Sequence, residues 1–393
     1  MAKKKNEVNI ENALEEFFNR VFSTAMAYRA SDIHIEPENN LVRVRFRVDG
    51  VLREIEQHPI SLLESLVSRI KVLSQMDISE HRRPLDGRFE INIQKKRLDI
   101  RVSTMPTIHG ENVAMRILDP TSSLLNLDSL GFDHEMLQEY LEVINKPYGI
   151  IFITGPNGSG KTTALYASLN KINTIEKSIA TLEDPVEYQL PLIRQTQVET
   201  GAGLTFAAGL RSLLRQDPDV ILVGEIRDKE TADIAVRSAL TGHMVFTSIH
   251  TNDSVGAIAR LNDMGVEPVL IASATVAIMA VRLVRVICRY CGKKYKVDSG
   301  LAKELHVPEN VTLVKAVGCA RCGDTGYKGR TGIFEMLLPD DKFRSDYLEK
   351  QSFDHLRRMA KASGMKTLRQ SGIEKATQGI TTIEEVLRVT KAI

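Results

Sequence analysis

The 393-residue chain contains no tryptophan, and its other aromatic residues are only nine tyrosines and twelve phenylalanines. Its formal net charge is +2, although 26% of its residues are charged. A nearly neutral chain without an aromatic-interleaved basic tract gives no reason to expect nucleic-acid binding. No stretch reaches the roughly 18 apolar residues of a membrane span, and the basic start Met1–Lys5 lacks the apolar core of a signal peptide. We therefore expect a cytoplasmic protein that reaches a membrane only through partners.

The longest apolar run extends from Val269 to Val281. It is shorter than a membrane span, it contains Ser273 and Thr275, and Arg282 follows it. We expect this run to form a buried helix of a soluble core.

Cysteine is also scarce, and all four cysteines fall in two pairs, Cys288-x-x-Cys291 and Cys319-x-x-Cys322. Structural disulfides are rare in a cytosolic protein, whereas two such pairs suit a tetrahedral zinc site. Four free buried thiols are the plain alternative. Redox chemistry is disfavoured because neither pair opens a helix after a strand. Four thiolates leave no coordination position for a catalytic water, so we expect a structural Zn²⁺.

Residues 155–162 form the pattern G-x-x-x-x-G-K-T, which is the phosphate-binding P-loop. An apolar run, residues 148–154, precedes it, and a helical pattern over 163–170 follows it, as a strand and a helix should. The lysine reaches the β- and γ-phosphates and the threonine hydroxyl binds Mg²⁺ in such loops. The predicted nucleotide-binding residues are Gly155, Pro156, Asn157, Gly158, Ser159, Gly160, Lys161, Thr162 and Thr163, with ATP and Mg²⁺ as ligands.

Three further short apolar strands are predicted at 179–182, 220–223 and 244–249, each followed by polar residues. Ligands in parallel sheets bind beyond the carboxyl ends of the strands, which directs attention to Glu183–Asp184, Glu225 and His250. Glu225 ends an apolar strand in the Walker B manner, so it is expected to hold Mg²⁺ together with Thr162 or to orient water. His250 is positioned to sense the γ-phosphate, while His243 lies at the opposite strand end.

The first 120 residues show mixed periodicity. Helical spacing runs from Ile10 to Tyr28 and from Leu62 to Met76, and strands are predicted at 42–48, 88–93, 98–103 and 113–118. We expect an α+β domain whose sheet has helices on one face. Arginines 43, 45 and 47 alternate with apolar residues, so they form either a solvated sheet face or a surface for an acidic partner.

The predicted domain organisation has five parts. Residues 1–120 form the N-terminal domain, 121–130 a linker, 131–286 a nucleotide-binding α/β core with a parallel sheet, 287–335 a tetracysteine zinc module, and 336–393 a C-terminal helical subdomain. The breaker-rich stretch Asp119–Ser123 marks the linker.

Several motifs occur in an order that closely resembles the type II secretion and type IV pilus assembly ATPases. They lie at 30–37, 83–88 and 101–104, then in the P-loop, and continue at 183–187, 214–219, 224–228 and 242–252. The resemblance covers nearly the whole chain. It implies an α/β protein with a PAS-like N-terminal domain and a RecA-like P-loop ATPase core, assembled as a hexamer. By the same resemblance Glu225 is the catalytic carboxylate, Glu183 supports metal and water, and Arg88 and Arg101 reach the phosphates, while the role of Arg116 stays open.

The resemblance further implies an ATP-hydrolysing motor that drives filament assembly through an inner-membrane platform protein, at the inner face of the cytoplasmic membrane. The tetracysteine lobe favours assembly over retraction motors. Asn157 stands where the family usually has threonine. Larger relatives carry a further N-terminal domain, so a naturally short protein and a trimmed one are both open.

Two other classes of function are weighed against the motor. One is a RecA-like nucleic-acid motor whose zinc module grips DNA, and the other is a scaffold that uses ATP only to set its shape. Within the family, the sequence does not choose between secretion, a pilus and a competence pilus for DNA uptake.

Overall fold

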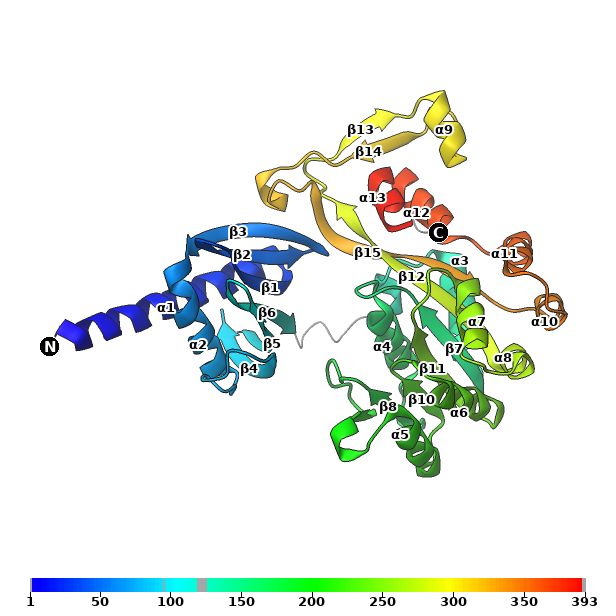
Figure 1. Ribbon diagram of the computed structural model, residues 1–393. Coiled ribbons are helices and arrows are strands. Elements are labelled where there is room, and N and C mark those ends of the chain that lie inside the picture. The colour runs from blue at the N-terminus through cyan, green and yellow to red at the C-terminus, as the bar shows by residue number, and fades with distance from the viewer. Residues whose placement is uncertain (1, 95, 119–125, 391–393) are drawn as a thin grey trace. The chain divides into compact units, whose positions relative to one another are not determined.

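The computed structural model describes residues 2–94, 96–118 and 126–390, with side chains from residue 14 onward except at residue 301. The chain divides into two compact units, Met1–Ser123 and Leu124–Ile393 (Figure 1). Asp119–Ser123 lies outside the described residues. Of the predicted linker 121–130, the described part includes a short 3-10 helix, Leu127–Ser129.

Unit 1 is built on a six-stranded antiparallel sheet with the strand order β3-β2-β1-β6-β5-β4. Its elements are α1 (Ala2–Tyr28), β1 (Ala30–Pro37), β2 (Leu41–Val48), β3 (Val51–Pro59), α2 (Leu63–Leu73), β4 (Leu85–Ile93), β5 (Lys96–Thr107) and β6 (Gly110–Leu118). The sequence predicted both helices and four of these strands, but not β1 or β3. Strands β2 and β3 are joined by a tight turn at Asp49 and Gly50, which both have positive φ, at 49° and 85°.

Helices α1 and α2 pack on one face of this sheet. Phe18 and Phe22 of α1 and Ile70 of α2 join a single apolar core with alternate residues of the strands, such as Ile33 and Phe46. Because side chains alternate along a strand, every second residue points to the opposite face, where polar residues collect.

The arginines at 43, 45 and 47 lie on that opposite face, and each is paired with a carboxylate of unit 1. Their partners are Glu38 and Glu54 for Arg43, Glu36 for Arg45, and Asp32 for Arg47. The charges of this row are therefore largely neutralised within the sheet, which supports the solvated-face interpretation over a surface for an acidic partner.

Unit 2 contains a seven-stranded sheet with the order β15-β12-β7-β11-β10-β8-β9. Its strands are β7 (Gly149–Thr154), β8 (Ile179–Glu183), β9 (Arg194–Gln197), β10 (Val220–Val223), β11 (Met244–Ile249), β12 (Thr275–Ile287) and β15 (Tyr327–Leu337). All neighbours are parallel except β12 and β15, which are antiparallel. The predictions of β7, β8, β10 and β11 are confirmed.

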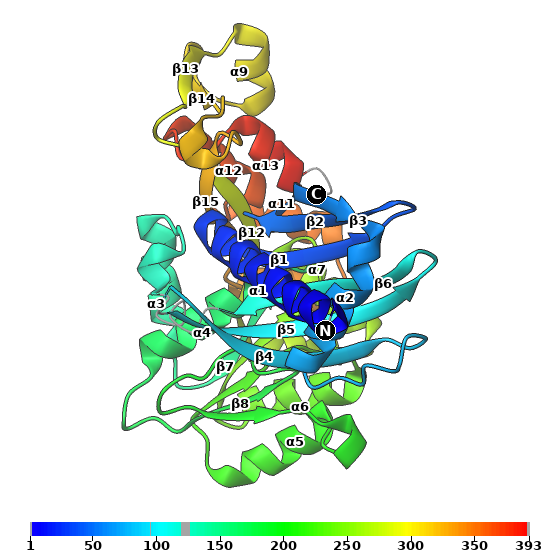
Figure 2. The same cartoon turned by 90° about the vertical axis from the view of Figure 1, so that its left-hand side faces the viewer.

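Helices cover both faces of this sheet (Figures 1 and 2). Helices α3 (His134–Ile144) and α4 (Lys161–Ile172) share one apolar core with it. A second core, on the other face, includes residues of α5 (Phe206–Leu213), α6 (Lys229–Leu240), α7 (Ser254–Asp263), α8 (Pro268–Ala274), α10 (Asp341–Leu348) and α11 (Phe353–Ala362). Two further helices, α12 (Leu368–Thr377) and α13 (Ile383–Thr390), follow toward the C-terminus.

The prediction of one helix over Val269–Val281 is wrong. The segment contains most of α8 and the first half of β12, which begins at Thr275. Strand β12 lies between β7 and β15, and its residues Ala277 to Val281 are buried on both faces. A doubly buried strand shows no alternation, so its apolar run looks like that of a buried helix.

The two cysteine pairs flank a small antiparallel ribbon. It consists of β13 (Lys293–Lys296) and β14 (Thr312–Lys315), with α9 (Ser299–Leu305) between them. After the second pair the chain returns to the large sheet as β15, which begins at Tyr327. Residues 327–335 of the predicted module 287–335 therefore belong to the sheet of the core. None of the helices among the described residues is long and apolar enough to cross a lipid bilayer.

Candidate functional site

The P-loop joins the end of β7 to the start of α4, as the sequence predicted. Gly160 precedes the helix in a left-handed conformation, with φ of 99°. A Cβ on Gly155, whose φ is 157°, would lie 2.3 Å from Ser159 Oγ and 2.8 Å from the Val281 carbonyl oxygen. Glycine is therefore required at Gly155 for steric reasons. The loop presents its N–H groups at a helix N-terminus, where anions are stabilised.

Lys161 is the first residue of α4 and folds over the loop. Its Nζ donates to the carbonyl oxygens of Gly155, at 2.8 Å, and Pro156, at 3.2 Å. Burial lowers the pKa of Lys161 to about 8, opposed by the Glu225 carboxylate and reinforced by the Arg282 guanidinium. A partly desolvated ammonium held by carbonyl groups gains more from a phosphate than a fully hydrated one would.

A cleft of about 670 Å³ lies beside the loop. It is lined by Pro156, Asn157, Glu225, Arg227, His250, Thr251 and Asn252. Strands β10 and β11 are parallel neighbours, so the residues that follow them meet at one edge of the sheet. The structure thus brings together Asn157, Glu225 and His250, which the sequence had singled out in separate motifs.

Glu225 has two side-chain neighbours in this cleft, Arg227 and His250. Its Oε1 accepts a hydrogen bond from Arg227, and its Oε2 lies 3.4 Å from His250 Nε2. Arg227 also lies 3.6 Å from Asp184 Oδ2 and so joins the residues that follow β8 and β10. The side chain of Glu225 is 16% exposed, which leaves it accessible from the cleft.

Glu183 has a different setting from Glu225. It is 4% exposed, and its oxygens accept hydrogen bonds from Tyr166, from Thr181 Oγ1 at 2.5 Å and from Gln195 Nε2 at 3.2 Å. It is not among the residues that line the cleft. Burial, together with the Glu183 carboxylate, raises the pKa of Tyr166 above its usual range. Glu183 is therefore placed to link α4 with β8 and β9.

The sequence did not predict the contacts that the loop after β11 makes with β7 and β12. Thr251 Oγ1 lies 2.5 Å from Thr154 Oγ1, and the Asn252 carbonyl accepts a hydrogen bond from Arg282 Nη2 at 2.7 Å. Arg282 is 5% exposed and also approaches Gly155. An arginine inside the apolar run of β12 was the available signal, because a cation is rarely buried without a specific partner.

The next two residues of this loop reach the C-terminal helices. Asp253 Oδ2 accepts from Arg357 Nε on α11 at 2.8 Å. Ser254 donates twice to Glu335 Oε1, at 2.9 and 2.6 Å, and Glu335 Oε2 accepts from the Leu368 N–H at 3.3 Å. Glu335 on β15 thereby holds the N-termini of both α7 and α12.

Arg88 and Arg101, for which the family resemblance implies contact with the phosphates, lie in unit 1. They are opposite each other in the β4–β5 pair, and Arg101 is opposite Arg116 in the β5–β6 pair. The three arginines therefore project from the same face of the sheet. Arg116 Nε is paired with Asp32 Oδ1 at 3.1 Å, while Arg88 is exposed.

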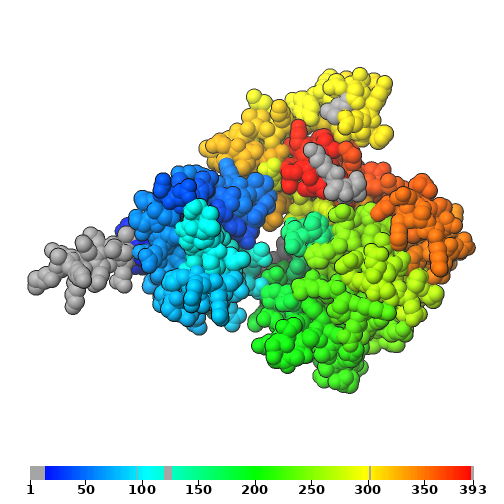
Figure 3. All heavy atoms as spheres, in the orientation of Figure 1, coloured from blue at the N-terminus to red at the C-terminus, as the bar shows by residue number. Residues whose placement is uncertain are grey.

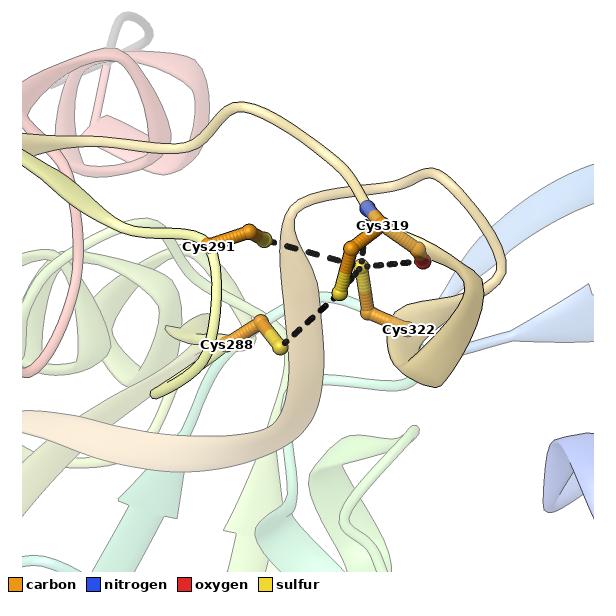
Figure 4. A group of neighbouring side chains, drawn as sticks. All are labelled: Cys288, Cys291, Cys319 and Cys322. Carbon is orange, nitrogen blue, oxygen red and sulfur yellow. Dashed lines mark hydrogen bonds between the residues drawn. The ribbon is translucent and has the colours of Figure 1, made fainter.

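The four cysteines form a compact cluster (Figure 4). Their sulfur atoms all lie within 4.8 Å of one another, and three pairs are separated by 3.8 to 4.0 Å. Tetrahedral Zn²⁺ with Zn–S distances of about 2.3 Å requires sulfur–sulfur distances of roughly 3.8 Å, so the donors fit this ion. Burial opposes ionisation of Cys322, but N–H groups of Cys319 and Gly326, both 3.2 Å from its sulfur, lower the pKa of the thiol.

A mostly parallel sheet with helices on both faces and a glycine-rich loop at a helix N-terminus defines an α/β protein suited to bind phosphate groups. The chain belongs to the Type II/IV secretion system protein family, whose pattern matches residues 7–388.

Two relatives and one solved structure show the extent of this similarity. Type II secretion system protein E of Pseudomonas aeruginosa is 48% identical over 375 residues, which cover 95% of this chain and 74% of that protein. The type IV pilus assembly ATPase PilB of Thermus thermophilus is 46% identical over 381 residues, covering 96% and 43%. The chain thus spans less than half the length of that PilB. The ATPase DotB of Yersinia pseudotuberculosis has the same fold, with a TM-score of 0.72, 22% identity and coverage of 96% and 94%.

Proposed function

We propose that the chain hydrolyses ATP to ADP and phosphate and couples this reaction to mechanical work in a type II secretion or type IV pilus assembly machine. The observation that carries the proposal is the meeting of Glu225 and His250 beside the P-loop in one cleft. The similarity to PilB and to type II secretion protein E supports the choice of machine.

In this proposal residues 155–163 hold the nucleotide. Lys161 leaves the carbonyl groups of the loop and binds the β- and γ-phosphates. Thr162, exposed in the first turn of α4, and Glu225 provide hard oxygen donors that suit Mg²⁺. The ion supplies charge neutralisation at the phosphates.

Glu225 is the proposed catalytic carboxylate, because it alone among the acids of the strand ends lines the cleft with His250. His250 Nε2 lies near the Oε2 of Glu225, and His250 is the proposed sensor of the γ-phosphate. Glu183, whose oxygens are engaged by Tyr166, Thr181 and Gln195, acts as a positioning residue rather than as a direct ligand.

We further propose that unit 1 is PAS-like, that unit 2 is a RecA-like core and that six chains form a ring. Residues 1–120 and 131–286 are then the N-terminal domain and the core, and β15 completes the sheet of the core. The cysteine module between β12 and β15 carries structural Zn²⁺, and the helices after β15 form the C-terminal helical part. Arg88 and Arg101 neutralise charge on the γ-phosphate as arginine fingers. The ring works in the cytoplasm on an inner-membrane platform protein.

A subunit-mixing experiment tests the proposal. Purified chain with Mg-ATP should release phosphate, with a specific activity that rises with protein concentration as rings form. Glu225→Gln and Arg88→Ala variants should each be inactive, and mixing them should restore turnover if the arginine of one chain serves the site of another. No phosphate release at any concentration would refute the ATPase assignment. If the unchanged chain releases phosphate but the mixture of the two variants does not, only the proposal that two chains share one site is refuted.

A further inference from the structure

The excess of positive over negative charge in this chain is concentrated in and next to the cysteine module. Residues 287–330, which are the module together with the first four residues of β15, contain nine lysines and arginines against four aspartates and glutamates, a net charge of +5, while the whole chain has +2. A zinc ion held by four thiolates would contribute −2, which leaves a net +3. The remainder of the protein is therefore acidic, and the positive charge is concentrated on one small module.

The charge is further segregated within the module. We call residues 287–297 and 311–330 the basic ribbon, since they include β13 and β14. The ribbon holds eight cations and one anion, Asp324. Its cations are Arg289, Lys293, Lys294, Lys296, Lys315, Arg321, Lys328 and Arg330. The intervening residues 298–310, which include α9, hold three acids and one lysine.

All eight cations of the basic ribbon are exposed, and none forms an ion pair with any residue that the structure describes. Lys293 lies directly opposite Lys315 in the β13–β14 pair, an arrangement of like charges that destabilises a sheet. The arginines at 43, 45 and 47 in the sheet of unit 1 are paired with neighbouring acids, whereas the cations of the basic ribbon are not. Its charge is available to a partner.

Two guanidinium groups are held in place on the ribbon's surface. The Arg321 guanidinium lies 4.0 Å from the centre of the Tyr290 ring, and that of Arg289 lies 4.9 Å from it. Arg289 also donates to the Tyr290 hydroxyl at 2.9 Å. The ring is 51% exposed. Guanidinium groups fixed in this way are suited to paired hydrogen bonds with carboxylates.

The ribbon also offers an open strand edge. Among the described residues β13 and β14 form a two-stranded sheet, and β14 packs toward α12, whereas no strand pairs with the outer side of β13. Three of the four residues of β13 are lysines. Edge lysines repel another basic strand, so an acidic strand is the kind that this edge admits. Figure 3 shows the module, in yellow and orange, as a projection of unit 2.

We propose that the basic ribbon is a docking surface for an extended acidic segment of a partner protein, which adds to the outer edge of β13 and places carboxylates on Lys294, Lys296 and the Tyr290-bound arginines. A strand edge and fixed guanidinium groups recognise a peptide backbone and carboxylates together. A layer of lipid headgroups supplies no backbone to pair with the edge. The surface lies outside the nucleotide cleft, so the proposal does not depend on ATP hydrolysis.

Binding of defined peptides to the full, zinc-loaded chain tests the proposal. The probe is the fluorescein-labelled peptide (Glu-Val)₄, followed by fluorescence anisotropy at 50 mM and 300 mM salt. The peptide (Glu-Pro)₄ has the same charge, but every second residue lacks an N–H group and has its φ fixed near −65°, so the peptide cannot form a regular strand. Vesicles of phosphatidylglycerol and an eight-residue thymidine oligonucleotide represent the other anionic partners. The variant K294E/K296E reverses the charge of two lysines on the edge strand β13. The variant K303E/K342E reverses two exposed lysines outside the basic ribbon and serves as the matched control.

We expect (Glu-Val)₄ to bind at least tenfold more tightly than (Glu-Pro)₄ and to weaken at higher salt. K294E/K296E should lose at least tenfold in affinity, while K303E/K342E stays within twofold of the unchanged chain. Equal binding of the two peptides, no effect of K294E/K296E, or tighter binding of vesicles or oligonucleotide than of (Glu-Val)₄ would overturn the proposal. Basal phosphate release by K294E/K296E should be unchanged, which separates this result from the test of the ATPase.

Discussion

Asp253 and Arg357 are 104 residues apart in the sequence, and a 2.8 Å hydrogen bond joins the Oδ2 of the first to the Nε of the second. The other oxygen of Asp253 caps α7 by accepting from the Gly256 N–H at 2.6 Å. Asp253 follows the cleft residues Thr251 and Asn252 directly. The C-terminal helix α11 is therefore bonded to the loop that forms one wall of the candidate nucleotide site.

Replacing Arg357 with methionine should loosen this loop while keeping the apolar stem of the side chain. We expect kcat/KM for ATP to fall about tenfold, equivalent to roughly 1.4 kcal/mol, since a partly buried charge-assisted hydrogen bond is lost. Arg358→Met is the matched control, because Arg358 is the exposed neighbour on the same helix. An equal loss in both variants would show that the Asp253 bond has no role of its own.

Glu225→Gln should abolish turnover and leave nucleotide binding intact. An amide cannot accept a proton from water, so we expect phosphate release to fall by roughly 10²- to 10⁴-fold. Binding of a fluorescent ATP analogue should stay within a few-fold of the unchanged chain. Glu230→Gln, at an exposed position on α6, serves as the control. Loss of binding in Glu225→Gln would instead assign this carboxylate mainly to holding the metal.

Arg88→Ala should lower turnover by roughly 10³-fold or more if the arginine meets the γ-phosphate. Arg97→Ala is the control, since Arg97 is also exposed, lies on the neighbouring strand and forms an ion pair with Glu90. Neither change should shift the melting temperature by more than a degree or two, because both side chains are exposed. Full activity of Arg88→Ala would remove it from the proposed site.

Zinc binding can be counted by thiol chemistry, because the chain has only four cysteines. The protein as purified should contain one Zn²⁺ and show no rapidly reacting thiols. After chelation at pH 7, four thiols should react with a disulfide reagent, and the metal released should match one equivalent per chain. Four fast thiols before chelation would refute the zinc site.

The buried Glu385 should make the packing of α13 sensitive to acid. Burial raises the pKa of Glu385, but hydrogen bonds from Arg388 and Arg285 outweigh burial and lower it to about 2. A depressed carboxyl pKa stabilises the fold above the unfolded value near 4.5, and this contribution, up to about 3 kcal/mol, is lost as the pH falls toward 2. Glu385→Gln should therefore flatten the pH dependence of chemical unfolding between pH 4.5 and 2, while Glu384→Gln, its neighbour on α13, should not.

The parts of the fold with strong local patterns could be predicted from sequence. The helical spacing of α1, the alternation along β2 and the P-loop between β7 and α4 depend on neighbouring residues only, and each is confirmed. Strand β9 was missed because its four residues are all polar and lie at the edge of the sheet. Strand β12 was mistaken for a helix because it is buried on both faces.

The sequence predicted which residues belong to the candidate site better than it predicted how they are arranged. Glu183 and Glu225 both end apolar strands, and sequence cannot tell that Tyr166 and Gln195 occupy the first while the second faces the cleft. The contacts of Asp253 with Arg357 and of Ser254 with Glu335 join residues that are 104 and 81 positions apart in the sequence. Such pairings depend on the packing of whole helices, which no local pattern encodes.

The cysteine module leaves the large sheet through β12 and returns through β15, and these two strands are paired with each other over most of their length. Strand β12 also pairs directly with β7, whose last residue, Thr154, begins the turn into the P-loop. A strand of 13 residues extends roughly 40 Å and resists stretching far more than a helix or loop of the same length. A force applied to the ribbon would therefore be transmitted, with little deformation, to the strand that leads into the P-loop.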